Sequence, residues 1–463
     1  MRARVRLGAA GGGVIVGALL ALTSLAAYAT DIVTHPGSLL TWYDLNVYND
    51  AGLIARELPG YLYQWQLSPG IRFTYPPIAA ILFEGGSALP YPLLRWLLTC
   101  CSVLALPLTA WLVLGAMGGR GGRRLTAALI VGALALWTEP VWHALFFGQI
   151  EPLLMLLVVF DLTRPDGRRW QGAGIGVAAG IKLIPLIFIP YLLLTGKVRQ
   201  AAVATGVFVS TVAAGFALLP GPSRQWWLTG YFLQPGKTGA VDALVNQALL
   251  GMFARAAGPS GATEAVWLPV AVAVLAIGML AGAALSRAGD QVAGWNLVAL
   301  TGLLVSPISW DHHWVWIVSF LALLAGLVLS ARRVRRWALV ALGIAALVIF
   351  GAWPASYTGA RAFVPSQGLL GGWSITGLQT WQVARTGAWS VVTWNLFVIA
   401  GSAAYLGLVL AAGLTWRSRR RARRALPASP GPARVAAVPE VAAPGVPALS
   451  RSAEPEADRV TGR

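Results

Sequence analysis

Long apolar segments, separated by short polar gaps, run along most of the chain. Several of them approach the roughly 20 residues that an α-helix needs to cross a bilayer. Because the membrane core offers no water to backbone N–H and C=O groups, such segments must be helical. The pattern therefore predicts an all-α polytopic membrane protein. Spans are expected near residues 8–28, 93–117, 125–137, 150–162, 198–219, 265–285, 292–305, 314–329, 337–353 and 390–416.

Two further apolar segments do not fit a simple crossing. Segment 73–89 is interrupted, and we interpret it as a re-entrant or partly embedded helix. Segment 172–194 lies between two basic clusters, so we expect two short helices that enter and return, broken near Lys182 and Pro185. Irregular backbone at that depth is tolerated where protein or a water-filled cavity surrounds it, and counting this hairpin as two gives about 12 membrane segments.

The distribution of charge predicts the orientation. Charged residues make up only 11% of the chain, yet the net charge is +18. In a soluble protein this would suggest a nucleic-acid partner. Here the basic clusters occupy gaps between spans, so the positive-inside rule explains them and no nucleic acid is expected. Both termini are then cytoplasmic, and the first span is an uncleaved helix rather than a signal peptide. The clusters assigned to the cytoplasm are 2–6, 120–124, 164–169, 197–199, 332–336 and 417–424.

The other loops are expected outside the plasma membrane, at residues 30–72, 138–149, 220–263, 306–313 and 354–389. These loops contain all four histidines and several carboxylates, so ionisable chemistry gathers on one face. Residues 1–416 form the predicted membrane domain. The Pro- and Ala-rich remainder, 417–463, is predicted to be a disordered cytoplasmic tail. Its initial Arg run suits contact with anionic membrane lipids.

Cysteine and histidine spacing gives no sign of a metal or disulfide framework. Cys100 and Cys101 are adjacent within an apolar run, and neighbouring cysteines form a strained bridge at best. The chain has no zinc-type Cys/His spacing. We therefore predict no metal and no cofactor.

The stretch "TWYDLNVYNDAG", residues 41–52, places Asp44 between Tyr43 and Tyr48, shortly after an apolar segment. A carboxylate at the membrane surface suits a general base that takes the proton of a hydroxyl nucleophile. The alternative is structural, because Asp ahead of an apolar-patterned stretch commonly caps a helix N-terminus.

The stretch "SPISWDHHW", residues 306–314, joins two predicted spans on the outside. His312 and His313 stand beside Asp311 and between Trp310 and Trp314. Imidazoles and backbone N–H groups at a helix start can hold a phosphate. The alternative is a group of interfacial aromatic residues. Adjacent His side chains diverge, so we do not expect them to ligate one metal together.

Lys182, in "GIKLIPL", is one of three lysines and lies within an apolar hairpin. A buried ionisable group in a membrane protein indicates function, here as a counter-charge to a phosphate. The alternative is that Lys182 snorkels to a lipid headgroup. Three smaller motifs, "FTYPP", "FFGQIEPLL" and "NQALLG", supply Tyr, Gln and Asn side chains that hydrogen-bond sugar hydroxyls; each is equally compatible with a turn or cap.

In the order of these motifs the chain resembles the actinobacterial polyprenol-phosphate-mannose-dependent α-1,2-mannosyltransferases of glycosyltransferase family 87. The resemblance covers roughly residues 44–329 and is carried by "YDLNVYNDAG", "FTYPP", "GQIEPLL", "GIKLIPLIFIPYLLLTGKVRQA", "NQALLG" and "SPISWDHHWVW". It implies a GT-C fold with its site on the extracytoplasmic side. One departure is Glu151 in "GQIEP", where a small or amide residue such as Asn is expected.

The resemblance also implies a reaction. The donor is a polyprenyl phosphate mannose, and its phosphate lies near His312, His313 and Lys182. The acceptor is a mannose hydroxyl of a glycolipid or cell-envelope glycan. Asp44 takes the hydroxyl proton, and the linkage inverts from β to α without a metal, through a transition state like that of glycosidases. Sugar and acceptor contacts are assigned to Tyr43, Tyr48, Tyr75, Gln149, Asn246, Gln247, Trp310 and Asp311.

Other functions remain open at this point. The same fold could carry an arabinosyltransferase, a protein O-mannosyltransferase or a lipid-to-glycan ligase. A lipid or sugar transporter is less favoured, because secondary transporters tend to show internal repeats and polar sites at the bilayer midplane. We find no clear repeat in the chain, and among the candidate residues only Lys182 fits a midplane site.

Overall fold

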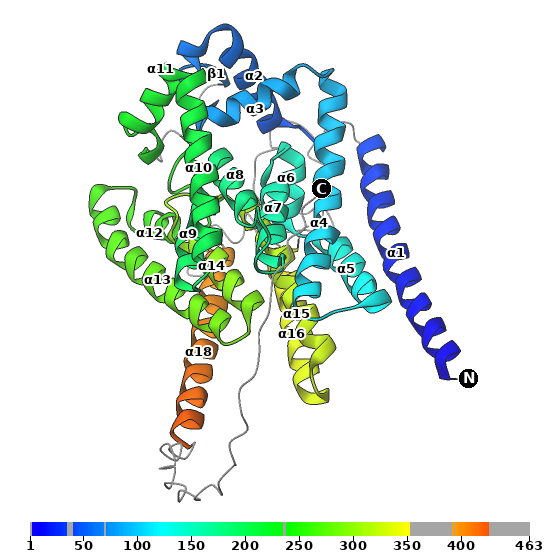
Figure 1. Cartoon of the computed structure of the whole chain (residues 1–463). Helices are drawn as coiled ribbons and strands as arrows, with labels where there is room; N and C mark the ends of the chain where they lie inside the picture. The colour runs from blue at the N-terminus through cyan, green and yellow to red at the C-terminus, as the bar shows by residue number, and fades with distance from the viewer. Residues whose placement is uncertain are drawn as a thin grey trace, which may run out of the picture. The chain divides into compact units, whose positions relative to one another are not determined.

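The computed structural model describes residues 2–34, 40–68, 71–234, 238–351, 391–392 and 394–425 (Figure 1). The predicted loop 354–389 and most of the predicted tail lie outside these residues. Within them the fold is almost entirely helical, as predicted. The first half of the chain contains α1 (Arg2–Thr34), α2 (Tyr43–Glu57), η1 (Pro59–Tyr61), α3 (Pro77–Ser87), α4 (Tyr91–Ala116), α5 (Gly121–Ala135), α6 (Glu139–Phe147), α7 (Glu151–Thr163), α8 (Ala173–Ile181), η2 (Ile184–Ile187), α9 (Phe188–Leu194) and α10 (Val198–Leu218).

The second half continues the helical pattern. It contains α11 (Pro220–Ser223), η3 (Arg224–Leu228), η4 (Tyr231–Leu233), α12 (Leu249–Ala257), α13 (Gly261–Arg287), α14 (Gln291–Val305), η6 (Asp311–Trp316), α15 (Ile317–Ser330), α16 (Arg333–Phe350) and α18 (Leu396–Ala425). One antiparallel pair of short strands, β1 (Gln66–Ser68) and β2 (Ile71–Arg72), lies between η1 and α3. The basic run 417–424 is helical and belongs to α18.

Several helices are long and apolar enough to cross a membrane. The described residues contain six such helices, or seven if the bent pair α6–α7 is one span. Their surfaces expose large apolar side chains, for example Leu19, Leu104, Leu280 and Leu410, as expected where lipid replaces water. The chain is therefore a multi-pass membrane protein. The six are Gly12–Thr34, Tyr91–Ala116, Val198–Leu218, Gly261–Arg287, Asp311–Ser330 and Leu396–Arg419.

The expected count of about 12 membrane segments is not confirmed. Segments predicted as spans at 125–137, 150–162 and 292–305 are helices, namely α5, α7 and α14. They have 15, 13 and 15 residues. At 1.5 Å per residue each is about 20–23 Å long, which is shorter than a typical hydrocarbon core of about 30 Å. Apolar composition alone therefore does not make them independent crossings.

The helix break near Lys182 is confirmed. Helix α8 ends at Ile181, and the chain resumes at η2 and then α9. Helix α8 packs tightly on α10 at Gly176, where a Cβ atom would stand 2.5 Å from the Ala204 carbonyl oxygen. This close approach holds the end of α8, and with it Lys182, inside the protein.

Candidate active site

A cavity of about 630 Å³ brings together most of the residues singled out in the sequence. It is lined from α2, the α6–α7 bend, the α8–η2 break and η6. A carboxylate, Asp44, and three basic side chains, Lys182, His312 and His313, face the same space. The other predicted residues on the lining are Tyr43, Tyr75, Gln149, Trp310 and Asp311.

The start of α2 fixes the position of Asp44. Trp42 has φ 49° and ψ 34°, a left-handed conformation that non-glycine residues rarely adopt. The backbone N–H groups of Thr41 and Trp42 both donate to the Phe146 carbonyl at 2.9 Å. Asp44 is the second residue of α2, and no side chain caps this helix. The helix-cap interpretation of Asp44 is therefore wrong.

The sharp bend between α6 and α7 presents Gln149 to Asp44. The two helix axes differ by 118°. Gly148 ends α6 with φ 69°, and a Cβ atom there would lie 2.9 Å from the Leu45 Cβ. Only glycine fits both the positive φ and this contact, so the bend rests directly against α2.

Hydrogen bonds link Asp44 to the basic end of the cavity. The Gln149 side-chain amide donates to Asp44 Oδ2. Gln149 Oε1 lies 2.6 Å from the Tyr48 hydroxyl and 3.2 Å from the Tyr75 hydroxyl, and the two hydroxyls are 2.7 Å apart. Each hydroxyl has one proton to donate, so a continuous chain runs from Tyr75 to Tyr48 and from Tyr48 to Gln149 Oε1. Lys182 Nζ donates to the Tyr75 hydroxyl at 3.4 Å. The donors can all point one way, from the Lys182 ammonium to the Asp44 carboxylate, and such chains strengthen their members.

Burial raises the pKa of Asp44 to about 6, although the charge of His312 and the bond from Gln149 act to lower it. A carboxylate with this pKa is mostly deprotonated at neutral pH, yet it is a stronger base than an ordinary aspartate. Because the Gln149 bond is made to Oδ2, Oδ1 is available to accept a proton from a ligand in the cavity.

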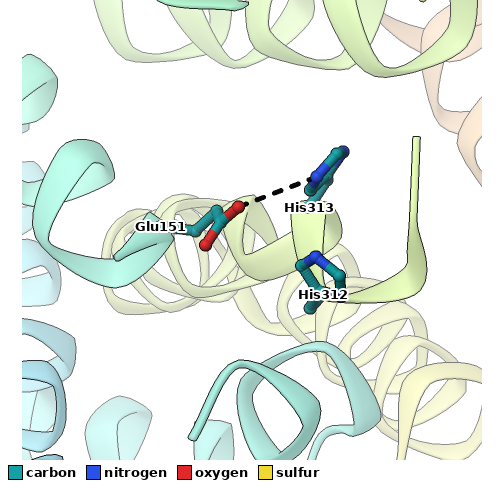
Figure 2. A group of neighbouring side chains, drawn as sticks. All are labelled: Glu151, His312 and His313. Carbon is teal, nitrogen blue, oxygen red and sulfur yellow. Dashed lines mark ion pairs between the residues drawn. The ribbon is translucent and has the colours of Figure 1, made fainter. Parts of the chain in front are cut away.

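Lys182 is the centre of the basic end. Its ammonium forms an ion pair with Glu151 and lies 3.1 Å from His313 Nε2. Glu151 Oε1 is 3.7 Å from the same His313 nitrogen, and Figure 2 shows the two side chains pointing toward each other with His312 alongside. The side chains of Glu151, His312 and His313 are each about 8% exposed, so this charge cluster is shielded from solvent.

Asp311 contacts His143 and His312. It accepts a bond from the His143 ring and another from the His312 backbone N–H at 2.7 Å. Its Oδ1 also lies 3.3 Å from His312 Nδ1. Asp311 is 2% exposed, and Glu139 is buried close by. Although Asp311 borders the cavity, its contacts indicate a positioning role for His312 rather than the predicted contact with sugar.

Two groups of side chains have the composition of cation sites. Ligand atoms of Glu151, His312 and His313 lie within 4.8 Å of one another, as do those of Glu139, His143 and Asp311. In the first group the Lys182 ammonium already contacts both Glu151 and His313. A divalent metal there would have to displace this ammonium. In the second group the carboxylate of Asp311 bonds the His143 ring directly. In the first group a protein cation, the Lys182 ammonium, therefore lies beside the candidate ligand atoms.

Three predicted sugar contacts are not on the cavity lining. Tyr48 is 2% exposed; its ring stacks on Phe83, and its hydroxyl donates a hydrogen bond to Gln149. Asn246 and Gln247 are buried, and their side chains bond backbone groups. Asn246 holds the loop before η6 by accepting from Ser309 N and donating to the Pro307 carbonyl.

Gln247 anchors the start of α18 by donating to the Trp394 carbonyl and accepting from Phe397 N. Asn246 and Gln247 therefore support the site from behind its walls. Because neither side chain lines the cavity, direct sugar contact is not their role in this structure.

Sequence reasoning missed two members of the site and doubted a third. His143 bonds Asp311 across 168 positions, a distance over which no local motif connects them. Arg72, at the end of β2, lines the cavity as a further cation. Glu151 was noted only as a departure from a family motif, whereas it is the ion-pair partner of Lys182. A buried lysine in an apolar hairpin needs a carboxylate partner, and that requirement was the available signal.

The tyrosine–glutamine chain gives a specific prediction. Tyr48→Phe should keep the stack on Phe83 but remove the hydroxyl that lies 2.6 Å from Gln149 Oε1. Because the Gln149 bond favours the charged form of Asp44, loosening it should raise the pKa of Asp44 and move the acid limb of the pH–rate profile to higher pH. Turnover at pH 6 should fall more than turnover at pH 8.

Tyr191→Phe is the matched control for Tyr48→Phe, since Tyr191 is also buried and its hydroxyl bonds Ser286 at 2.6 Å, away from the cavity. Both variants should lose about 1 kcal/mol of stability from one buried hydrogen bond. An unchanged acid limb in Tyr48→Phe would mean that the chain does not act on Asp44.

Comparison with known proteins identifies a family of related sequences. The model of glycosyltransferase family 87 matches residues 73–307, which is half of the chain. A polyprenol-phosphate-mannose-dependent alpha-(1-2)-phosphatidylinositol pentamannoside mannosyltransferase from Mycobacterium tuberculosis is 33% identical over 65% of this chain and 68% of the relative. A protein of the same description from Mycolicibacterium smegmatis is 33% identical over 72% and 82%.

A further relative differs in its described acceptor. It is a polyprenol-phosphate-mannose-dependent alpha-(1-2)-phosphatidylinositol mannoside mannosyltransferase from Mycobacterium tuberculosis, 32% identical over 63% of this chain and 70% of the relative. No solved structure matches the chain significantly. The family match and the extent of these similarities lead to one assignment: the chain belongs to glycosyltransferase family 87.

Proposed function

We propose that this protein is an inverting mannosyltransferase that moves mannose from a polyprenyl phosphate mannose donor to a mannose hydroxyl of a phosphatidylinositol mannoside, forming an α-1,2 linkage. One observation carries the proposal beyond family membership. A carboxylate with a pKa of about 6 and a shielded cluster of basic side chains line the same cavity. Transfer of a sugar from a phosphate to a hydroxyl needs a base for the hydroxyl proton and positive charge for the leaving phosphate in the same cavity.

The reaction follows from the placement of these groups. Asp44 Oδ1 takes the proton of the acceptor hydroxyl while that oxygen bonds to the anomeric carbon of mannose. The bond from the anomeric carbon to the phosphate oxygen breaks, and its electron pair leaves with the polyprenyl phosphate. Attack opposite to the leaving group changes the β linkage of the donor to α in the product.

Lys182, His312 and His313 stabilise the negative charge that grows on the leaving phosphate. In this state Lys182 is shared between Glu151, His313 and Tyr75. A phosphate that enters the cavity becomes a further partner for the same ammonium. Glu151 keeps Lys182 charged and in place until the donor arrives, which explains why a carboxylate stands at this motif position.

We also propose a GT-C arrangement in which the cavity faces the extracytoplasmic side and both termini are cytoplasmic. The basic clusters assigned to the cytoplasm contribute none of the described residues that line the cavity. The donor lipid can therefore present its phosphate from the outer leaflet, while the acceptor sugar approaches from outside. The division into a membrane domain, residues 1–416, and a cytoplasmic tail, residues 417–463, is part of this proposal.

Sidedness can be tested by cysteine labelling in a background without Cys100 and Cys101. A cysteine in place of Thr238, which lines the cavity, should react with an impermeant thiol reagent in intact cells. A cysteine in place of Gly167, in the α7–α8 connection, should react only after the cells are opened. Reversed labelling would contradict the orientation and place the cavity on the side of nucleotide sugars.

The function itself is tested by incubating membranes that contain the protein with radiolabelled polyprenyl phosphate mannose and phosphatidylinositol mannoside acceptors. The expected product carries one additional mannose that an α-1,2-specific mannosidase removes. A polyprenyl phosphate arabinose donor and a protein acceptor test the nearer alternatives. Movement of the donor across vesicles without transfer would instead favour a flippase and contradict the proposal.

A further inference from the structure

A second cavity, of about 500 Å³, lies beside the candidate active site and is almost entirely apolar. It is enclosed by α14, η6, α15, α16 and α18 within the described residues. Helix α18 contributes a row of small residues, including Ala404 and Gly407, and the opposing walls are mainly leucine and aromatic side chains. The small side chains of α18 leave room for the cavity, and the large apolar side chains of the opposing helices make its walls hydrocarbon-like.

The cavity is elongated along α15. Its lining on this helix runs from Ile317 to Leu327, ten residues apart. At 1.5 Å per residue this corresponds to about 15 Å. On α16 the lining runs from Leu339 to Phe350, a similar length. An apolar space that is lined over this length of both helices can take up a linear hydrocarbon chain.

Both cavities are lined in part by η6, a short helix of six residues. His312 and His313 line the polar cavity, whereas Trp314 and Trp316, the next residues in the same turn, line the apolar one. Phe350 stacks on Phe397 with ring centroids 4.4 Å apart, and Trp314 packs against both rings at this end. From there the apolar cavity extends along α15, away from the phosphate-binding side chains.

We propose that this apolar cavity binds the isoprenoid tail of the lipid-linked donor. The inference rests on the proposed function, because it requires a phosphate ester at His312 and His313. A phosphate held there presents its ester oxygen to Trp314 and Trp316, and the attached chain continues between α15, α16 and α18. The tail thereby sets the depth of the sugar, and the anomeric carbon stops beside Asp44.

The test compares two donors, geranyl phosphate mannose and a long-chain polyprenyl phosphate mannose. Ala404→Phe and Gly407→Phe each place a ring in the cavity. Both variants should raise KM for the long-chain donor by about tenfold, equivalent to about 1.4 kcal/mol, and leave the geranyl donor nearly unchanged. The matched control is Gly413→Phe on the same helix. Gly413 also has open space where a Cβ would stand, but it does not line the cavity.

A second measurement uses a long-chain polyprenyl phosphate that carries a photoreactive diazirine near the middle of its chain. It should label peptides of α15, α16 or α18, and excess unmodified polyprenyl phosphate should prevent the labelling whereas phosphatidylcholine should not. If phosphatidylcholine prevents the labelling as well as polyprenyl phosphate does, the cavity holds an ordinary membrane lipid and the inference is overturned.

Other outcomes separate this inference from the proposed function. If the filling variants slow both donors equally, or act no more strongly than Gly413→Phe, the tail binds elsewhere. If they unfold the protein, the cavity is filled by protein, for example by a segment of this chain outside the described residues, and the inference also fails. If the wild-type protein transfers mannose from neither donor, the proposed function itself has failed.

Discussion

Asp44→Asn should lower turnover by about 10²–10⁴-fold, the range typical for loss of general-base catalysis. The asparagine side chain keeps the shape of aspartate, and its amide oxygen can still accept the bond from Gln149. It has no carboxylate to take a proton from the acceptor hydroxyl. Since the proposed role of Asp44 is toward the acceptor hydroxyl and not toward the donor phosphate, KM for the donor should change little. The measurement is transfer of radiolabelled mannose by purified protein in detergent or vesicles.

The pH dependence of turnover provides an independent test of Asp44 as the general base. With a pKa of about 6, Asp44 becomes protonated as the pH falls below 6, so wild-type turnover should decrease there and level off above it. The residual activity of Asp44→Asn should lack this acid limb. Asp50→Asn is the matched control, because Asp50 is half-buried in the same helix but does not line the cavity. Near-normal transfer by a well-folded Asp44→Asn protein would remove Asp44 from the catalytic role.

Lys182→Met should damage both stability and donor binding. It leaves Glu151 buried without its ammonium partner, and breaking a buried ion pair in this way costs about 3–5 kcal/mol. It also removes a charged donor to the phosphate, worth about 1.5–3 kcal/mol, so KM for the donor should rise roughly 10–100-fold. Unfolding in denaturant and donor titrations measure the two effects separately.

The double variant Lys182→Met/Glu151→Met separates structure from phosphate binding. Replacing a buried ion pair by apolar side chains of similar size is often neutral for stability. The double variant should therefore unfold nearly like the wild type while KM for the donor stays high. Lys197→Met is the control, because Lys197 pairs with an exposed carboxylate, Asp166, and such surface pairs contribute about 0–1 kcal/mol. A double variant with normal donor KM would place the phosphate away from Lys182.

The sequence could predict the features that depend on local patterns, but not those that depend on contacts between distant segments. Membrane helices, the break at Lys182 and the grouping of Asp44 with Lys182 and the histidine pair were all predicted. Each depends on a local pattern: an apolar run of a given length, a lysine inside such a run, or short motifs whose order resembles that of a known family. The span count was not confirmed, because α5, α7 and α14 are apolar but short, and packing determines whether such a helix crosses or bends.

The roles within the site needed the tertiary structure. Tyr48 and Asp44 are four residues apart on α2, yet one is buried behind Gln149 and the other faces the cavity. Asn246 and Gln247 have the chemistry of sugar ligands, but their partners are backbone groups of η6 and α18 that no sequence window contains.

What the sequence alone determined is thus the helical membrane architecture, the family motifs and the types of side chain available for the reaction. The tertiary structure decided that Glu151 pairs with Lys182, that Asp311 contacts His143 and His312, and that η6 lines both the polar cavity and an apolar one. The physical reason is that burial and pairing of ionisable groups depend on segments 31 to 168 positions apart meeting in space. Local hydrophobic pattern records which helices form, but not which side chains of different helices come to share one desolvated site.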